Sequence, residues 1–284
     1  MNKDRKLISK AKLLVVKLGT GVLSSTKGGL DSYRIAHLAD QVAHLHRLKK
    51  QVVIVSSGAV WAGMARLNLR NRPTHVADFQ ACAAVGQNLL MAKYERAFAR
   101  RKLTVAQILL THEDFRHPQR RHHARQTILN LLLRGVVPII NENDAVSFDE
   151  IKLGDNDQLA AMVHELINAQ GCIILSNVDG FIAGDISSVM SAVRKLSATR
   201  GSSIKHRMPR PLSTITKITA EIERQAGDSH HSHRSVGGMR SKLLAAKRVL
   251  ATGHPLVIAN GHTPNILLRL IRGELLGTIF LKKR

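Results

Sequence analysis

Five short apolar runs, separated by stretches with helical spacing, dominate the chain. Each run is rich in Val, Ile and Leu and ends in a turn that carries Gly, Ser, Asn, Asp or Lys. Short β-branched runs are typical of strands buried on both faces. With their turns they occupy residues 13–21, 52–59, 136–144, 172–180 and 254–261. Buried strands that alternate with helices predict an α/β fold with a mostly parallel sheet, in which ligands bind beyond the carboxyl ends of the strands.

The intervening segments are predicted to be helices. Asp31 to Lys49 has apolar residues at helical spacing, with Asp31 as a plausible N-cap. Further helices are expected at 76–99, 158–167 and 241–252, a short one at 219–226, and closing strands at 257–258 and 278–281. Residues 185–233 are dense in Ser, Thr, Arg, Pro and His, which indicates a basic, partly mobile excursion from the core. We expect residues 1–284 to form a single domain.

Composition places the chain among cytoplasmic globular proteins. Its 284 residues, 44% of them hydrophobic, suffice for one large core. Cys82 and Cys172 lie in apolar runs, so we expect buried thiols in a reducing compartment, without a disulfide or a metal site. The first apolar run is interrupted at Lys17, too soon for a signal peptide or a membrane span. No membrane partner is therefore expected.

The charge raises the possibility of nucleic-acid binding. The formal net charge is +23, with a pI near 10.9. The positive residues are spread along the chain, however, and no zinc-finger, cold-shock or RNA-recognition signature is present. We therefore expect no specific nucleic-acid partner, only weak, salt-sensitive contact with RNA or DNA.

Two glycine-rich turns next to lysines are candidate phosphate sites. Lys17 to Gly21 follows the first strand, and Gly237 to Lys242 leads into a helix. Glycines let backbone N–H groups approach phosphate oxygens, and lysines supply charge. The first turn fits neither the Walker pattern nor the dinucleotide fingerprint, and by itself it could be a tight turn with a surface lysine. Two lysines around one phosphoryl group suit phosphoryl transfer.

A third cluster joins two polar strand ends to a helix start. Ser56 to Ala59 offers hydroxyls and amides to an anion, although a simple N-cap would explain it equally well. Asn141 to Asp144 and Lys152 to Asp157 crowd polar side chains together without the spacing of a calcium loop. Asp144 could hold the ammonium of an amino acid, and Asp155 or Asp157 could position a lysine or a metal–nucleotide. The alternative to a binding site is a solvated acidic loop without a functional role.

In this order the motifs resemble those of the amino acid kinase family, and most closely the members that phosphorylate the γ-carboxylate of L-glutamate. The resemblance covers residues from about 12 to 281. The matching strings are Val16-Lys17-Leu18-Gly19-Thr20, Val55-Ser56-Ser57-Gly58-Ala59-Val60, Ala84-Val85-Gly86-Gln87, Pro138-Ile139-Ile140-Asn141-Glu142-Asn143-Asp144-Ala145-Val146, Gly154-Asp155-Asn156-Asp157 and Gly237-Gly238-Met239-Arg240-Ser241-Lys242.

The resemblance implies a three-layer α/β/α sandwich that uses ATP and Mg²⁺ for the first step of proline synthesis. It implies that Lys17 and Lys242 stabilise the phosphoryl group and that Asp155 organises them. The implied acceptor-binding residues are Ser57, Gly58, Ala59, Asp144 and Asn156. The implied nucleotide-binding residues are Lys17, Gly19, Ser176, Asn177, Val236, Gly237, Gly238, Met239, Arg240, Ser241 and Lys242. No protein ligand to a metal is assigned, because ATP would carry the Mg²⁺. A homo-oligomer and feedback inhibition by proline are also expected.

Departures from the family pattern fall on the nucleotide side. Asn177 stands where the family commonly has aspartate, and Val236 stands where a threonine is usual. The expected Asp-Pro after Phe181-Ile182 is missing, and the excursion is long and basic. The C-terminal PUA domain of many members is not seen. Two alternatives stay open: another kinase of this fold, acting on carbamate, acetylglutamate or a nucleoside monophosphate, or a degenerate kinase fold with a sensing or RNA-binding role.

Overall fold

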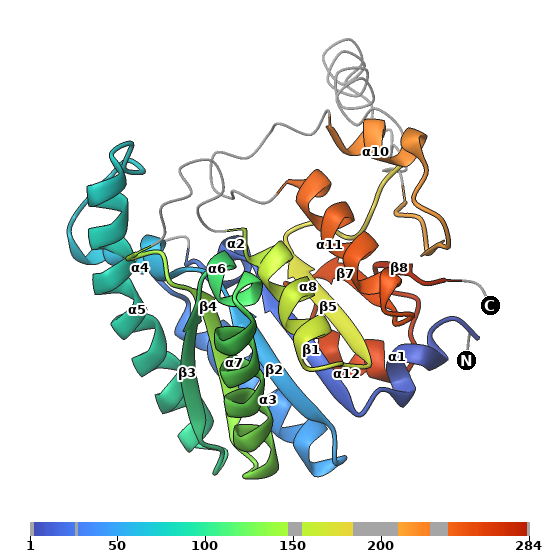
Figure 1. The fold of residues 1–284 in the computed structure, drawn as a ribbon, viewed down its shortest axis with the longest axis horizontal. Coiled ribbons are helices and arrows are strands. Elements are labelled where there is room, and N and C mark those ends of the chain that lie inside the picture. The colour runs from blue at the N-terminus through green and yellow to red at the C-terminus, as the bar shows by residue number, and fades with distance from the viewer. Residues whose placement is uncertain (1–2, 26–27, 147–154, 184–209, 228–237, 283–284) are drawn as a thin grey trace, which may run out of the picture.

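A sheet of eight strands forms the centre of the part of the chain that the structure describes (Figure 1). The computed structural model describes residues 3–25, 28–146, 155–183, 210–227 and 238–282. The strand order is β3-β4-β2-β1-β5-β7-β8-β6. Their bounds are β1 (Leu13–Leu18), β2 (Gln51–Ser56), β3 (Val105–Leu110), β4 (Val137–Glu142), β5 (Gly171–Ser176), β6 (Thr214–Ile215), β7 (Leu256–Asn260) and β8 (Thr278–Phe280).

The sheet is mostly parallel, as predicted. All neighbouring strands pair in parallel except β7 and β8, which run antiparallel. The five apolar runs predicted as strands correspond to β1, β2, β4, β5 and β7. Strand β3 was not predicted. It lies at the sheet edge, where most of its residues are only partly buried and the polar Gln107 is exposed. The two-residue β6 was not predicted either.

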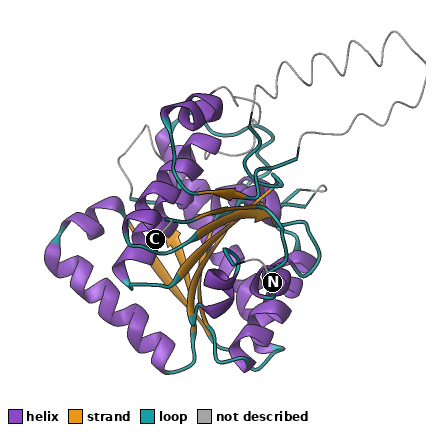
Figure 2. Ribbon diagram, turned by 90° about the vertical axis from the view of Figure 1, so that its right-hand side faces the viewer, coloured by secondary structure: helices purple, strands orange, loops and turns teal. Residues whose placement is uncertain are grey.

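Helices cover both faces of the sheet, which gives the expected three layers (Figure 2). Their bounds are α1 (Lys6–Lys10), α2 (Thr20–Leu23), α3 (Ser32–Arg47), α4 (Ala59–Arg66), α5 (Val76–Ala99), α6 (His112–Arg116), α7 (Pro118–Leu133), α8 (Asn156–Leu166), α10 (Ala220–Gly227), α11 (Met239–Ala251) and α12 (Ile266–Ile271). The predicted helices match α3, α5, α8, α10 and α11 to within two residues at every end. Asp31 caps α3 by accepting from the N–H groups of Tyr33 and Arg34, as expected.

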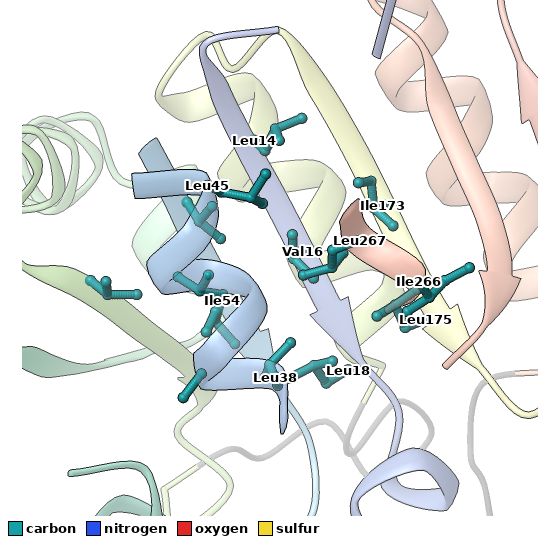
Figure 3. Packing of buried hydrophobic residues seen from close by; sticks show 14 of the residues in the cluster. Leu14, Val16, Leu18, Leu38, Leu45, Ile54, Ile173, Leu175, Ile266 and Leu267 are labelled. Carbon is teal, nitrogen blue, oxygen red and sulfur yellow. The ribbon is translucent and has the colours of Figure 1, made fainter. Parts of the chain in front are cut away.

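Successive side chains of a strand point to opposite faces of the sheet, so the hydrophobic core has two halves. Leu14, Val16 and Leu18 of β1 pack with α3 and α12 on one face (Figure 3). Val15 points to the other face, where it packs with α8 and α11. Burying each such side chain contributes about 1.5–3 kcal/mol. Cys82 and Cys172 are both buried free thiols, as predicted.

Most of the expected excursion lies outside the described residues, as do Gly154, Val236 and Gly237. None of the described helices has the length and apolar character needed to cross a bilayer.

Candidate active site

A pocket of about 650 Å³ lies at the carboxyl ends of β1, β2, β4 and β5. The N-terminal ends of α4, α8 and α11 supply side chains to the same pocket. Most of the residues predicted from the strand-end motifs meet there. The predicted residues in its wall are Lys17, Gly19, Ser57, Gly58, Ala59, Asp144, Asn156, Ser176, Asn177 and Lys242.

Two lysines and one carboxylate form the cationic end of the pocket. The Nζ of Lys17, from β1, lies 2.6 Å from Oδ1 of Asp157. The Nζ of Lys242, from α11, donates a hydrogen bond of 2.9 Å to Oδ2 of the same residue. Asp157 is fully buried, and the two lysines are 6% and 5% exposed. Burial alone would raise the pKa of Asp157, but attraction to both ammonium groups outweighs it and holds that pKa below its usual value.

The expectation that Asp155 organises the two lysines is wrong. Asp155 is the N-cap of α8, and its carboxylate accepts from the N–H groups of Asp157 and Gln158. It also accepts a 2.5 Å hydrogen bond from the hydroxyl of Ser241, at the start of α11. A residue at the cap faces its own first turn, whereas Asp157, two residues further on, faces the sheet. Asp155 therefore joins the two helix starts, and Asp157 pairs the lysines.

The turn after β2 is shaped by glycine. Gly58 has φ +105°, a backbone conformation that residues with a side chain rarely adopt, and it is the N-cap of α4. Helix α4 then crosses α5 at close range, because a Cβ on Gly63 would come within 1.9 Å of the Cys82 carbonyl oxygen. A Cβ on Gly86 would come within 1.7 Å of the Ala59 carbonyl oxygen. This close crossing fixes Ser57 and Ala59 at the pocket.

A chain of buried amides holds Asn156 in place. Its Nδ2 donates to Oγ of Ser57 at 2.9 Å and to Oδ1 of Asn141 at 3.0 Å. The Nδ2 of Asn141 in turn donates to Oε1 of Gln87 on α5 at 2.9 Å. Sequence reasoning assigned no role to Asn141 or Gln87, although both stand in the quoted motifs. Among the described residues, Oδ1 of Asn156 has no hydrogen-bond partner, so it is available to a ligand.

Asp144 adds an anionic group to the pocket wall just after β4, which β2 separates from β1 and its Lys17. It is 5% exposed, and its Oδ1 is buried without a hydrogen-bond partner in the described part of the chain. Burial and the nearby carboxylate of Glu142 raise the pKa of Asp144 to about 7, against the opposing charge of Arg72. A buried carboxylate oxygen with no donor is costly. The site therefore favours a cationic ligand group.

Most of the described residues expected to bind the nucleotide are more exposed than those expected to bind the acceptor. Asn177 is exposed at the end of β5, and its Oδ1 accepts a hydrogen bond of 3.3 Å from Oγ of Ser176. Gly238 is the exposed N-cap of α11. Met239 packs partly against the core, and Arg240 is exposed and absent from the pocket wall. The geometry brings Ser176 and Asn177 to the pocket beside Gly19, but none of Gly238, Met239, Arg240 and Ser241.

Comparisons with known proteins agree with this geometry. A sequence profile of the amino acid kinase family matches residues 12–260. The glutamate 5-kinase of Citrifermentans bemidjiense is 43% identical over 277 residues, which are 98% of this chain and 69% of that protein. The glutamate 5-kinase of Bordetella pertussis is 44% identical over 272 residues, which are 96% of this chain and 67% of that protein.

Solved structures with lower sequence identity share the fold. Carbamate kinase from Giardia lamblia, bound to AMP-PNP, superposes with a TM-score of 0.62 at 17% identity, covering 97% of this chain and all of that one. UMP kinase from Bacillus anthracis superposes with a TM-score of 0.60 at 14% identity, covering 96% of this chain and 97% of that one. The chain belongs to the amino acid kinase family and, within it, to the glutamate 5-kinases.

Proposed function

We propose that the pocket transfers the γ-phosphoryl group of ATP to the γ-carboxylate of L-glutamate. The observation that carries this proposal is the division of charge in one pocket. The wall contains the Lys17 and Lys242 ammonium groups, paired by Asp157 beyond the end of β1, and, on the far side of β2, Asp144 after β4, whose Oδ1 has no hydrogen-bond partner among the described residues. An acceptor with an ammonium at one end and a carboxylate at the other matches this polarity. The product would be L-glutamyl 5-phosphate, the first intermediate of proline synthesis.

The two lysines would act on the transferring group. Negative charge on the phosphoryl oxygens and on the attacking and leaving oxygens must be stabilised in the transition state, mainly by fixed cations. Asp157 holds both ammonium groups in position, and the three side chains together carry a net charge of +1. The lysines therefore keep an excess of positive charge directed at the phosphoryl group. Asp155 would contribute indirectly, by fixing the start of α11.

The acceptor would be held by the remaining polar groups of the pocket. Asp144 would accept hydrogen bonds from the α-ammonium of glutamate. Ser57, whose hydroxyl oxygen accepts from Nδ2 of Asn156 and whose O–H can still donate, would bind its carboxylate oxygens together with the N–H groups of Gly58 and Ala59 at the start of α4. Both N–H groups of Asn156 are committed to Ser57 and Asn141, so its free Oδ1 would accept from the ammonium of glutamate. Each of these groups faces the pocket, which supports a single bound orientation.

ATP would lie over the turn after β1, near Gly19, Ser176 and Asn177, with Gly238 and its neighbours at the start of α11. The donor set fits a triphosphate, because it offers backbone N–H groups and two lysines. We assign no protein ligand to Mg²⁺, which the ATP phosphates would hold; it would supply further charge neutralisation. Assembly into a homo-oligomer and inhibition by proline remain proposals.

Asp144→Asn should weaken glutamate binding by about 10- to 150-fold, because a charged hydrogen bond contributes roughly 1.5–3 kcal/mol. In the wild type, kcat/KM for glutamate should also rise with pH up to about 7, the pKa of Asp144, since only the ionised carboxylate binds an ammonium. This rise should be absent in the variant. Steady-state kinetics at several pH values measures both effects.

Asp40→Asn is the matched control for Asp144→Asn. Asp40 is exposed on α3 and pairs with Arg101, outside the pocket. Its substitution should leave KM for glutamate unchanged. If Asp144→Asn instead raises KM for ATP and spares KM for glutamate, Asp144 binds the other substrate.

An acceptor screen tests the proposed function itself. ADP release should be measured with ATP, Mg²⁺ and, in turn, glutamate, aspartate, N-acetylglutamate, carbamate and UMP. We expect robust turnover with glutamate. Turnover of another acceptor with none on glutamate would overturn the proposal.

A further inference from the structure

The loop between α4 and α5 places an arginine in the pocket wall that the roles above do not use. Arg72 lies in this loop, at residues 67–75, and contributes to the same pocket as Asp144. The guanidinium carbon lies 5.4 Å from the ring centre of Phe79, on the first turn of α5. Phe79 is itself buried and also lines the pocket. Arg72 is exposed as a whole, and its guanidinium lies over this buried aromatic ring.

The charge of Arg72 interacts with that of Asp144 in the pocket wall. Burial lowers the pKa of Arg72 from its usual value, and the charge of Asp144 acts in the opposite direction. Conversely, Arg72 is the opposing charge that lowers the pKa of Asp144. No ion pair within 4.0 Å joins Arg72 to an acid in the described part of the chain, so its N–H groups are not committed to Asp144.

Arg72 is a cation close enough to interact with Asp144, a carboxylate whose Oδ1 has no hydrogen-bond partner among the described residues. This pair matches the α-carbon end of an amino acid. That end carries one ammonium and one carboxylate on the same carbon. Asp144 accounts for the ammonium only. An arginine presents a planar fork that matches a carboxylate with two parallel hydrogen bonds. Stacking on Phe79 limits the orientations of the guanidinium, so less freedom is lost when a ligand binds.

We propose that Arg72 is a specificity-determining residue that binds the α-carboxylate of the acceptor, while Phe79 positions it. Arg72 and Asp144 together recognise the zwitterionic end of the substrate, and the lysine cluster receives its γ-carboxylate. An acceptor whose α-carboxylate is neutral or missing loses the arginine contact. This inference rests on the proposed function, because it assigns one end of the proposed acceptor.

The test compares glutamate with isoglutamine, in which the α-carboxylate is an amide and the γ-carboxylate is intact. The wild type should bind isoglutamine at least about tenfold more weakly, since one charge-assisted contact is lost. In Arg72→Gln the affinity for glutamate should fall about ten- to hundredfold, and that for isoglutamine should change little. The two ligands should then bind almost equally. Calorimetry measures these affinities without turnover, and kcat for glutamate should change far less than its KM.

Two further variants separate binding from structure. Phe79→Leu should weaken glutamate binding in the same selective way, but by less, because the arginine remains. Arg66→Gln, on the exposed end of α4 and outside this pocket, should change neither affinity. The inference would be overturned if Arg72→Gln lost affinity for glutamate and isoglutamine equally. It would also be overturned if the wild type bound the two ligands with equal affinity. A wild type that phosphorylates no glutamate would instead overturn the proposed function.

Discussion

Replacing Lys17 or Lys242 by alanine is expected to lower kcat by about 10²-fold or more, with little change in KM for glutamate. A cation that meets charge developing in the transition state contributes little to binding of the ground state. The magnitude is that of removing one preorganised donor from a reaction centre. Both ammonium groups are nearly buried and face the pocket, so water cannot replace them easily. Initial-rate kinetics with varied glutamate and varied ATP separates the two parameters.

Lys247→Ala is the control for these variants. Lys247 lies on α11 with Lys242, but it is exposed and pairs with Glu223 rather than with the pocket. Its substitution should leave kcat unchanged. If kcat of both Lys17→Ala and Lys242→Ala stays near the wild-type value, neither lysine takes part in the chemistry.

Asp157→Asn is expected to be the most damaging substitution for both folding and activity. Among the described residues it removes the negative charge that pairs both lysines, each at most 6% exposed. Removing one partner of a buried ion pair typically costs 3–5 kcal/mol, because the other charge stays buried without compensation. The lysines should also repel one another and leave their positions, so kcat should fall at least as far as in the lysine variants. Urea unfolding and kinetics measure the two losses.

Asp155→Asn gives the contrast that tests the corrected assignment. Asparagine is nearly as good an N-cap as aspartate, so α8 should keep its start, and stability should fall by less than about 1 kcal/mol. The hydrogen bond from Ser241 has an acceptor in asparagine as well. A larger loss of kcat in Asp155→Asn than in Asp157→Asn would restore Asp155 as the organiser of the lysines.

These two aspartates show where sequence reasoning reached its limit. The sequence places Asp155 and Asp157 at the start of one helix, and the motif indicates that an acid should meet the lysines. Which acid does so depends on the residue at which the helix begins. Sequence patterns locate helix ends only to within a few residues. A shift of two residues turns a side chain by about 200°, from the cap to the face that packs on the sheet.

Other features were predictable because one physical signal dominated them. The five buried strands showed as β-branched runs, and α5 showed as helical spacing over 24 residues. Strand β3 gave a weak signal, because an edge strand is only half covered and tolerates polar residues. The link from Gln87 through Asn141 to Asn156 joins α5, β4 and α8. Such contacts between distant segments follow from packing, and local pattern does not specify them.

Arg72 illustrates the same limit at the pocket. Its stretch of sequence, Arg70 to Pro73, reads as an ordinary polar loop. Only the folded chain places Arg72 over Phe79 and near Asp144, which lies more than 60 residues further along the chain.

Identification of the phosphorylated atom tests the central claim most directly. The enzyme should be incubated with glutamate, ATP and Mg²⁺ in the presence of hydroxylamine, and the hydroxamate formed should be identified by mass spectrometry and NMR. Transfer to the γ-carboxylate predicts γ-glutamyl hydroxamate in step with ADP release, and neither product in Lys242→Ala above about a hundredth of the wild-type rate. Release of ADP without hydroxamate, or formation of the α-hydroxamate, would contradict this assignment of the two ends of the pocket.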